Sequence, residues 1–265
     1  MITKIHPHPC LDHLIEYYWI EKNGSSSVRV LPDGSTSIIF NIGGEIRITD
    51  SNGNKKTYTD NLIIGAQKKY IVLQTIKQTN IIGIKFKQGE AFHFFNIPMA
   101  QFTDGIANLS DVLTDENNTL GKGLINASTE DEVARILDYY FFINVEAQTS
   151  ASVVVKSVIN KVQASESPVL IKDICETENI SNKHLISLFN KKVGLSPKLL
   201  YRINKFTKVI ELLQVKTNVN WPQIAYECNY YDQAHLINEF KNFSGLLPSE
   251  YYKNKNAIGL RVLLS

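Results

Sequence analysis

Cysteine is scarce in this 265-residue chain, and long apolar runs are missing. Its three cysteines, Cys10, Cys175 and Cys228, are widely spaced and form no CxxC pair and no cluster with histidine. This pattern indicates neither a disulfide framework nor a structural zinc site, and it suits a reducing compartment. Residues 1–20 lack the features of a signal peptide, and no uncharged apolar stretch approaches the roughly 18 residues of a membrane span. We therefore expect a cytoplasmic protein without membrane contact.

A large net charge is also missing, because the chain carries only +2 in total. The charge is unevenly divided, however. Residues 1–150 hold 13 Lys and Arg against 17 Asp and Glu, whereas residues 151–265 hold 15 against 9. An acidic first part and a basic second part indicate that only the second part meets a polyanion.

The first part has the pattern of a meandering antiparallel sheet. Short β-type runs are separated by the turn dipeptides Asp33-Gly34, Gly43-Gly44 and Asn52-Gly53. The runs are SIIFNI, EIRITD, KKTYTD and the segments 61–64, 70–76 and 80–86. Gly83 in the last run predicts a bulge or a close approach of backbone. Helices are expected near 109–113 and 129–143, and the aromatic group Tyr17, Tyr18 and Trp19 is expected near a helix as core.

A polar hinge at 146–152 divides the chain into two expected domains, 1–148 and 152–256. After the hinge the spacing of apolar residues is helical throughout, as in the run Leu199, Ile203, Phe206, Ile210 and Leu213. The fold class we predict is α+β with two domains. The first is an antiparallel β-sheet or barrel with flanking helices, and the second is an all-α domain.

The all-α part contains an internal repeat. Four residues recur with a displacement of 51 positions: Leu185, Phe189, Gly194 and Pro197 as Leu236, Phe240, Gly245 and Pro248. Three upstream residues recur with a displacement of 50: Ile174, Cys175 and Asn179 as Ile224, Ala225 and Asn229. The second copy therefore has one extra residue near its turn.

Each copy has the chemistry of a helix-turn-helix unit. Cys175 and Ala225 are small enough for a closely crossing helix, and the two turn asparagines tolerate a left-handed backbone. Ser181 and Asp232 are expected to cap the two recognition helices. A long helix from Pro197 to about Gln214 would join the units, so that the recognition helices reach major-groove turns about 34 Å apart.

The outward faces of the two recognition helices supply the candidate base contacts. In the first helix these are Asn182, Lys183, Ile186 and Ser187. In the second helix they are Gln233, Ala234, His235, Ile237 and Asn238. The candidate phosphate contacts, which position the protein without reading sequence, are Lys191, Lys192, Lys205 and Lys241.

With these motifs in place, the segment from IKDICETENI to LLPSEYY resembles the DNA-binding domain of the AraC/XylS regulators. The resemblance implies a promoter-binding regulator, in most members an activator that responds to a small effector, and hence contact with RNA polymerase. The family usually places an arginine two residues before each motif phenylalanine, where this chain has Ser187 and Asn238. The usual turn glycine is Asn179 or Asn229, and Tyr252 replaces a common arginine. We interpret these departures as altered sequence preference.

The first domain resembles the β-rich domain that precedes this DNA-binding unit in some family members, through VLPDGSTSIIFNI and IIGIKFKQG. The resemblance implies a domain for effector binding or for formation of a homodimer, without naming the effector. A metal site of the cupin kind is not expected, because 28–86 contains no histidine. His6 and His8 are interpreted as surface residues, and no cofactor or catalytic residue is assigned.

Two alternatives remain open. The chain could be an interaction protein that keeps the helix-turn-helix fold without sequence-specific DNA binding. It could also be an enzyme fused to a DNA-binding unit, with Cys10 as an alkyl acceptor, although no base-rich motif adjoins this cysteine.

Overall fold

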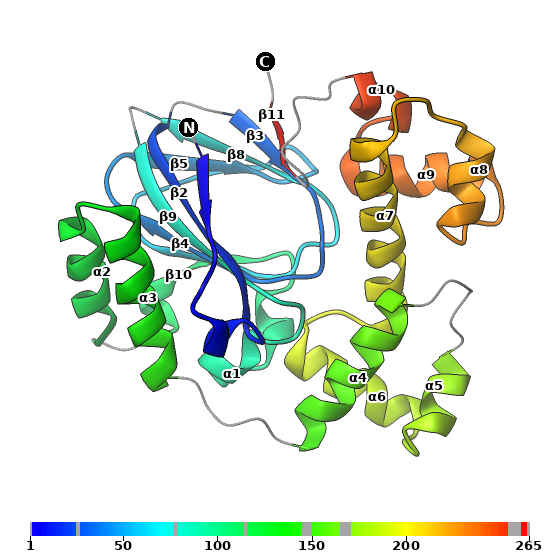
Figure 1. Ribbon diagram of the computed structural model, residues 1–265, viewed down its shortest axis with the longest axis horizontal. Helices are drawn as coiled ribbons and strands as arrows, with labels where there is room; N and C mark the ends of the chain where they lie inside the picture. The colour runs from blue at the N-terminus through cyan, green and yellow to red at the C-terminus, as the bar shows by residue number, and fades with distance from the viewer. Residues whose placement is uncertain are drawn as a thin grey trace.

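Alternating apolar residues build two antiparallel sheets in the N-terminal part of the chain (Figure 1). The computed structural model describes residues 2–24, 27–76, 79–113, 116–144, 150–164, 171–253 and 261–263. The first sheet has six strands in the order β1 (Ile2–Ile5), β2 (Ile15–Gly24), β9 (Thr79–Phe86), β4 (Ser37–Asn41), β7 (Leu62–Ile64) and β10 (Ile106–Asn108). The second has five strands in the order β11 (Arg261–Leu263), β3 (Ser27–Val30), β8 (Ile71–Ile76), β5 (Glu45–Thr49) and β6 (Lys55–Tyr58).

The two sheets pack their inner faces against each other. In β5 and β8, buried residues alternate with more exposed ones, so that one face of each strand joins the core. Ile46 and Leu73 of the five-stranded sheet share a buried cluster with Trp19 and Ile39 of the six-stranded sheet. The interior of this β-domain is therefore apolar.

The outer face of the six-stranded sheet is covered by helices. These are η1 (Pro9–Leu11), α1 (Phe92–Phe95), η2 (Met99–Phe102), η3 (Leu109–Asp111), α2 (Glu116–Asn126) and α3 (Glu130–Asn144). Phe86 of β9 contacts Phe141 of α3 edge to face, with ring centroids 5.6 Å apart. Strand β9 is thus buried on both faces, because one face meets the opposite sheet and the other meets these helices.

The prediction of a β-rich N-terminal domain is confirmed, and the aromatic group near its start is part of it. Tyr17, Tyr18 and Trp19 lie in strand β2, and of these Tyr18 donates its hydroxyl to Asp138 of helix α3 at 2.9 Å. Gly83 faces Trp19 across the β2–β9 ladder, and a Cβ on this glycine would lie 1.9 Å from the indole ring. The expected close approach at Gly83 is confirmed, and the large indole explains why no side chain fits there.

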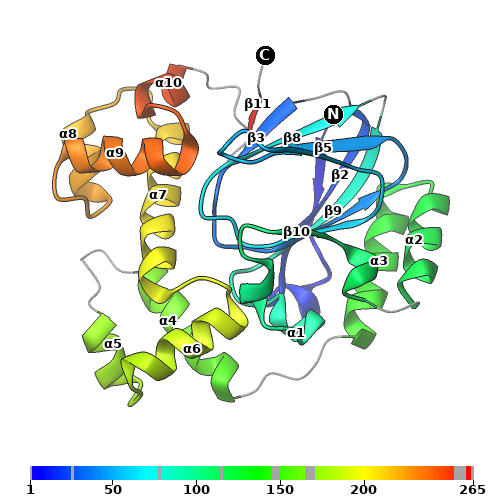
Figure 2. The same ribbon diagram turned by 180° about the vertical axis from the view of Figure 1, so that it is seen from behind.

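The C-terminal part consists of helices, as predicted up to residue 253 (Figure 2). They are α4 (Ser150–Ala164), α5 (Ile171–Thr177), α6 (Asn182–Lys192), α7 (Pro197–Val215), α8 (Trp221–Glu227), α9 (Gln233–Ser244) and α10 (Pro248–Lys253). Residues 146–149 of the expected hinge lie outside the described residues, and α4 begins within the hinge at Ser150. The expectation that everything after the hinge is helical was wrong at 261–263, because these residues pair with β3 as strand β11.

Helix α7 joins two similar helix pairs, α5–α6 and α8–α9, and shares a core with both. Ile203, Phe206 and Ile210 of α7 are fully buried in this core, and Leu199 is half-buried. Phe206 packs against Phe240 of α9, with ring centroids 5.1 Å apart. Both helix pairs are therefore anchored to one long helix.

Candidate nucleic-acid interface and interdomain pocket

The turns of the two helix pairs have the left-handed backbone that the asparagines predicted. Asn179 has φ 52° and Asn229 has φ 59°. In each turn the next residue donates its backbone N–H to the small residue of the first helix, Ile180 to Cys175 at 3.0 Å and Tyr230 to Ala225 at 2.8 Å. Asparagine tolerates this conformation better than other residues with a Cβ. The two turns are thus built in the same way.

The predicted caps of the second helices are also confirmed. The Ser181 hydroxyl accepts a hydrogen bond from the backbone N–H of His184 at 3.1 Å. The Asp232 carboxylate accepts one from the backbone N–H of His235 at 2.7 Å. These bonds satisfy free amides at the start of α6 and α9, each of which would otherwise weaken the helix by about 1 kcal/mol.

The apolar faces of α6 and α9 are buried, and the opposite faces meet solvent. Leu185, Phe189, Leu236 and Phe240 are at most 1% exposed. Of the candidate base contacts, those exposed are Asn182, Lys183, Ile186, Ser187, Ala234, His235 and Asn238. Each of the two helices therefore presents a largely polar face to solvent.

Three candidates on α9 also make contacts within the protein. Ile237 is half-buried and packs against the helical core, and Gln233 is half-buried beside it in a small groove with Trp221. The His235 ring lies edge to face with Tyr230, and its Nδ1 accepts a hydrogen bond from the Tyr231 N–H at 3.4 Å. His235 thus supports the turn as well as lying on the exposed face.

Lys191 and Lys241, two of the candidate phosphate contacts, are exposed near the ends of α6 and α9. Lys192 must be corrected, because it is only 3% exposed. Its ammonium donates to the Ser152 hydroxyl at 2.7 Å and lies 3.9 Å from the centre of the Phe92 ring. A lysine in this position joins three parts of the protein and cannot reach a phosphate.

Lys205 requires the same correction. Its ammonium donates to the Asn229 carbonyl at 3.1 Å and lies 4.2 Å from the centre of the Tyr230 ring. Burial lowers the pKa of the Lys205 ammonium. This half-buried side chain lines a pocket between the domains, and its ammonium is held by the Asn229 carbonyl instead of projecting from the exposed face of a recognition helix.

A salt bridge between α7 and α9, which was not predicted from the sequence, holds α9 in its orientation. Arg202 of α7 donates to both carboxylate oxygens of Glu239, at 2.7 Å each. Hydrogen bonds from Arg202 lower the pKa of the Glu239 carboxyl, so that the pair stays charged. This bidentate pair holds the inner side of the second recognition helix against α7.

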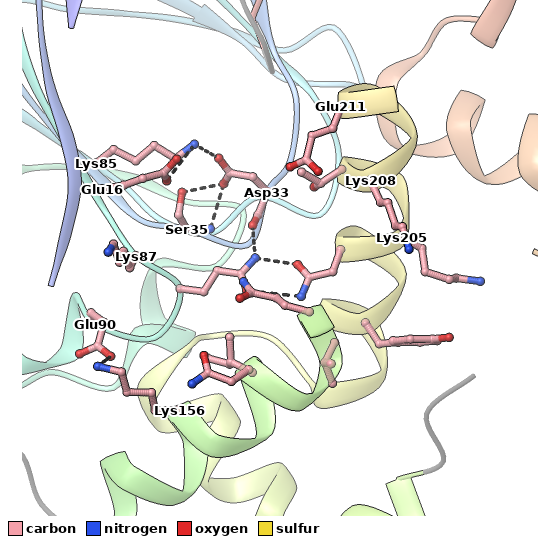
Figure 3. A pocket seen from close by; sticks show the side chains of 18 of the residues that line it. Glu16, Asp33, Ser35, Lys85, Lys87, Glu90, Lys156, Lys205, Lys208 and Glu211 are labelled. Carbon is pink, nitrogen blue, oxygen red and sulfur yellow. Dashed lines mark hydrogen bonds and ion pairs between the residues drawn. The ribbon is translucent and has the colours of Figure 1, made fainter. Parts of the chain in front are cut away.

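The pocket beside Lys205 has a volume of about 760 Å³ and is formed by both domains. It lies between the end of β9 with its following loop, helix α4 and helix α7 (Figure 3). Gln88 donates to the Asp33 carbonyl at 2.6 Å and to the Asn204 side chain at 2.7 Å, so it links the two domains across the pocket. Lys205, Lys208 and Glu211 of α7 line the C-terminal side.

A buried ion pair forms the N-terminal side of this pocket. Lys85 on β9 donates to Asp33, and Glu16 lies 3.6 Å from the Lys85 ammonium. Burial alone would raise the pKa of Asp33, but Lys85 and hydrogen bonds from Ser35 hold it below its usual value. Burial likewise opposes the charge on Lys85, and Asp33 raises its pKa above the usual value. Both groups therefore stay ionised.

The sequence indicated only a turn at Asp33, and Lys85 is not among the predicted site residues. The available signal was a lysine in the otherwise apolar run IIGIKF, because a buried lysine needs an acidic partner. A second hollow of about 210 Å³ extends from this ion pair toward the apolar interior at Trp19, Ile39 and Leu73. The ion pair thus separates a polar opening from an apolar interior.

Neither a metal cluster nor a membrane-spanning helix is found among the described residues. Within the described ranges, no three His, Cys, Asp or Glu side chains gather in an arrangement that could hold a metal ion. Among the described helices, none combines the length and apolarity needed to cross a membrane.

Cys228 lines the interdomain pocket, and burial raises the pKa of its thiol to about 12. This thiol is therefore a poor nucleophile.

Residues 174–254 match the family described as a helix-turn-helix domain, and residues 3–108 match a domain of unknown function, DUF6597. An uncharacterized HTH-type transcriptional regulator of Haemophilus influenzae is 31% identical over 85 residues. The match covers 32% of this chain and 28% of that relative, so the chain spans less than a third of that protein's length.

Solved structures share the two-domain fold. An apo variant of ToxT from Vibrio cholerae has a TM-score of 0.50 at 14% identity, covering 89% of this chain and 97% of that one. ToxT bound to (E)-4-(8-methylnaphthalen-1-yl)but-3-enoic acid has a TM-score of 0.50 at 10% identity, covering 88% and 97%. The C-terminal part of this chain thus matches a helix-turn-helix domain family, and its β-rich N-terminal part matches a domain family whose function is unknown.

Proposed function

We propose that the chain is a transcription regulator that binds duplex DNA with α6 and α9. The observation that carries this proposal is the repetition of one helix-turn-helix unit, each copy with a left-handed asparagine in its turn, a side-chain cap on its second helix and a largely polar exposed face. Lys191 and Lys241 lie beside these faces, where a phosphate backbone would pass. The basic balance of residues 151–265 favours the same partner.

Selection of bound duplexes from a random library by the full chain tests the proposal. We expect a bipartite motif with half-sites about one helical turn apart. Binding of the selected duplex should weaken steeply with salt, because each lysine–phosphate contact releases counterions. No enriched motif, with only weak salt-sensitive binding, would favour the interaction protein that keeps the fold without reading sequence.

We further infer that the interdomain pocket binds a small organic acid as effector. Residues of both domains line the pocket. On its α7 side, Lys205 and Lys208 supply positive charge. Burial makes the charge on Lys205 costly, and an anion nearby would stabilise that charge. ToxT, which shares the fold, has been crystallised with a naphthyl butenoic acid.

Thermal unfolding with that naphthyl butenoic acid, across a range of pH, tests the effector site. We expect the acid to raise the unfolding temperature of the wild-type chain and to have little effect on Lys205→Met. Because the acid binds the protonated lysine, affinity should fall as the pH rises through the lowered pKa of Lys205. Lys55→Met, in an exposed strand of the β-domain, is the matched control. An equal rise in all three proteins would contradict this site.

The proposed regulator acts in the cytoplasm, contacts RNA polymerase when it activates a promoter, and forms a homodimer through its N-terminal domain. Transcription by RNA polymerase from a promoter that carries the selected duplex tests the polymerase contact. Sedimentation of the purified chain tests the homodimer. The proposal includes no enzymatic reaction. Cys10 is exposed with its Sγ 2.9 Å from His8 Nδ1, and stoichiometric transfer of a DNA methyl adduct to Cys10 would revive the enzyme alternative.

A further inference from the structure

The two recognition helices end in equivalent glycines, and both glycines touch the N-terminal domain. Gly194 and Gly245, which are 51 positions apart, have φ of 83° and 70°. A Cβ on Gly194 would lie 2.8 Å from the Met99 carbonyl oxygen, and one on Gly245 would lie 2.4 Å from the Tyr70 ring. The same point of each repeat is therefore pressed against the β-domain.

Hydrogen bonds to backbone carbonyls strengthen both contacts. At the first unit, the Thr103 hydroxyl donates to the Gly194 carbonyl at 2.5 Å. At the second unit, Arg29 donates to the Ser244 carbonyl at 2.9 Å and the Tyr70 N–H donates to the Phe243 carbonyl at 2.9 Å. The Arg29 guanidinium also lies 4.3 Å from the centre of the Tyr70 ring. We call these two sets of contacts the first brace and the second brace.

The braces come from separate places in the β-domain. Thr103 follows η2, whereas Arg29 is in β3 and Tyr70 immediately precedes β8. Both views show the β-domain beside α7, with α1 toward the α6 end and β3 toward the α9 end (Figures 1 and 2). The β-domain therefore spans the two units as a second connection parallel to α7.

The braces leave the candidate DNA-facing residues uncovered. Asn182 and Ser187 of α6 and Asn238 of α9 are exposed, although the C-terminal ends of these helices contact the β-domain. These contacts therefore do not block the recognition faces. Because each brace holds one unit against the β-domain, the two braces together restrain the orientation of one unit relative to the other.

We propose that the N-terminal domain sets the relative orientation of the two helix-turn-helix units through these braces, and so fixes the half-site spacing that the chain accepts. The effect on half-site spacing rests on the proposed DNA-binding function. The effect on the orientation of the two units does not. Every donor and acceptor of both braces belongs to this chain.

The orientation can be measured without DNA. Spin labels on Asn190→Cys and Asn242→Cys, in a background without Cys10 and Cys175, report the distance between α6 and α9. We expect a narrow distance distribution in the chain with intact braces. Thr103→Val with Arg29→Met, which removes both side-chain donors and keeps most of their apolar bulk, should broaden it.

Matched controls are Thr57→Val and Arg47→Met, which make the same changes at other positions of the β-domain. Each single variant, Thr103→Val or Arg29→Met, removes the side-chain donor of one brace and serves if the double variant does not fold. An unchanged distribution in folded brace variants overturns the inference.

Half-site spacing supplies the second measurement. The wild-type chain should discriminate against selected duplexes whose half-sites are moved by one base pair, and the brace variants should lose that discrimination. Equal discrimination by both proteins overturns the inference. The brace variants could broaden the distance distribution while neither they nor the wild-type chain binds DNA specifically. That result would refute the proposed function but support the effect of the braces on orientation.

Discussion

Lys191 and Lys192 are neighbours in sequence that differ in burial. Both ammoniums lie near the Phe92 ring, at 5.4 and 3.9 Å from its centre, but Lys191 is exposed whereas Lys192 is buried and also donates to Ser152. Lys192→Met should lower the free energy of unfolding by about 1–2 kcal/mol, because a hydrogen bond and a cation–π contact are lost. Lys191→Met should change it by less than about 0.5 kcal/mol. Urea denaturation of the two variants measures both values.

The same pair should behave in the opposite way in DNA binding. Lys191→Met is expected to reduce the slope of log affinity against log salt by about 0.9, the value for one phosphate contact. Lys192→Met should leave the slope unchanged. A slope that falls equally in both variants would restore Lys192 as a phosphate contact and contradict our correction.

Asn238 and Lys241 separate base reading from phosphate contact on α9. Asn238→Ala should weaken binding by about 1–3 kcal/mol at selected base positions, because an amide pairs with adenine edges. Lys241→Ala should weaken binding to all sequences alike. Affinities for a set of single-base variants of the selected duplex test this, with Lys55→Ala as the remote control. Uniform effects from both changes would refute the assignment.

At the scale of the element, the turn between α8 and α9 depends on the backbone of Asn229. Asn229→Ala should lower the free energy of unfolding by about 1–2 kcal/mol, because alanine at φ 59° is strained. Asn229→Gly should be nearly neutral, since glycine adopts this conformation freely. Thermal or urea unfolding measures the difference, and Asn190→Ala, on an exposed helical position, is the control.

The equivalent pair at Asn179 should repeat that result in the first unit. Equal stability of the alanine and glycine variants in both units would show that the turns relax without strain.

The helix-turn-helix units were predictable from sequence because the turn asparagine, the cap and the helix that follows lie within a few positions of one another. The strand runs from 37 to 86 were predictable for the same reason, since alternation and turn dipeptides are local signals.

At the scale of the whole molecule, the Asp33–Lys85 pair couples stability to pH. The pKa of Asp33 is below its usual 3.8, so its contribution is present above that value and is lost as pH falls through the lowered pKa. The raised pKa of Lys85 makes its contribution persist until pH rises above the usual 10.5 toward the raised value. Between these limits the pair is intact.

Asp33→Asn should therefore lower the free energy of unfolding by about 3 kcal/mol at neutral pH, because it leaves Lys85 buried with Glu16 as the nearest acid. The difference from wild type should shrink as pH falls below the usual pKa of Asp33. Urea denaturation at a series of pH values checks this. A difference that stays constant in acid would mean that Asp33 acts through packing and not through its charge.

The sequence by itself determined the repeated helix-turn-helix unit, the left-handed turns at Asn179 and Asn229, and the caps at Ser181 and Asp232. Each of these follows from short-range rules of backbone geometry and hydrogen bonding. Only the tertiary structure decided that Lys192 is buried, that Lys205 lines the interdomain pocket, that Lys85 meets Asp33, and that the β-domain contacts both units. Those outcomes depend on contacts between residues far apart in the chain, which no local pattern records.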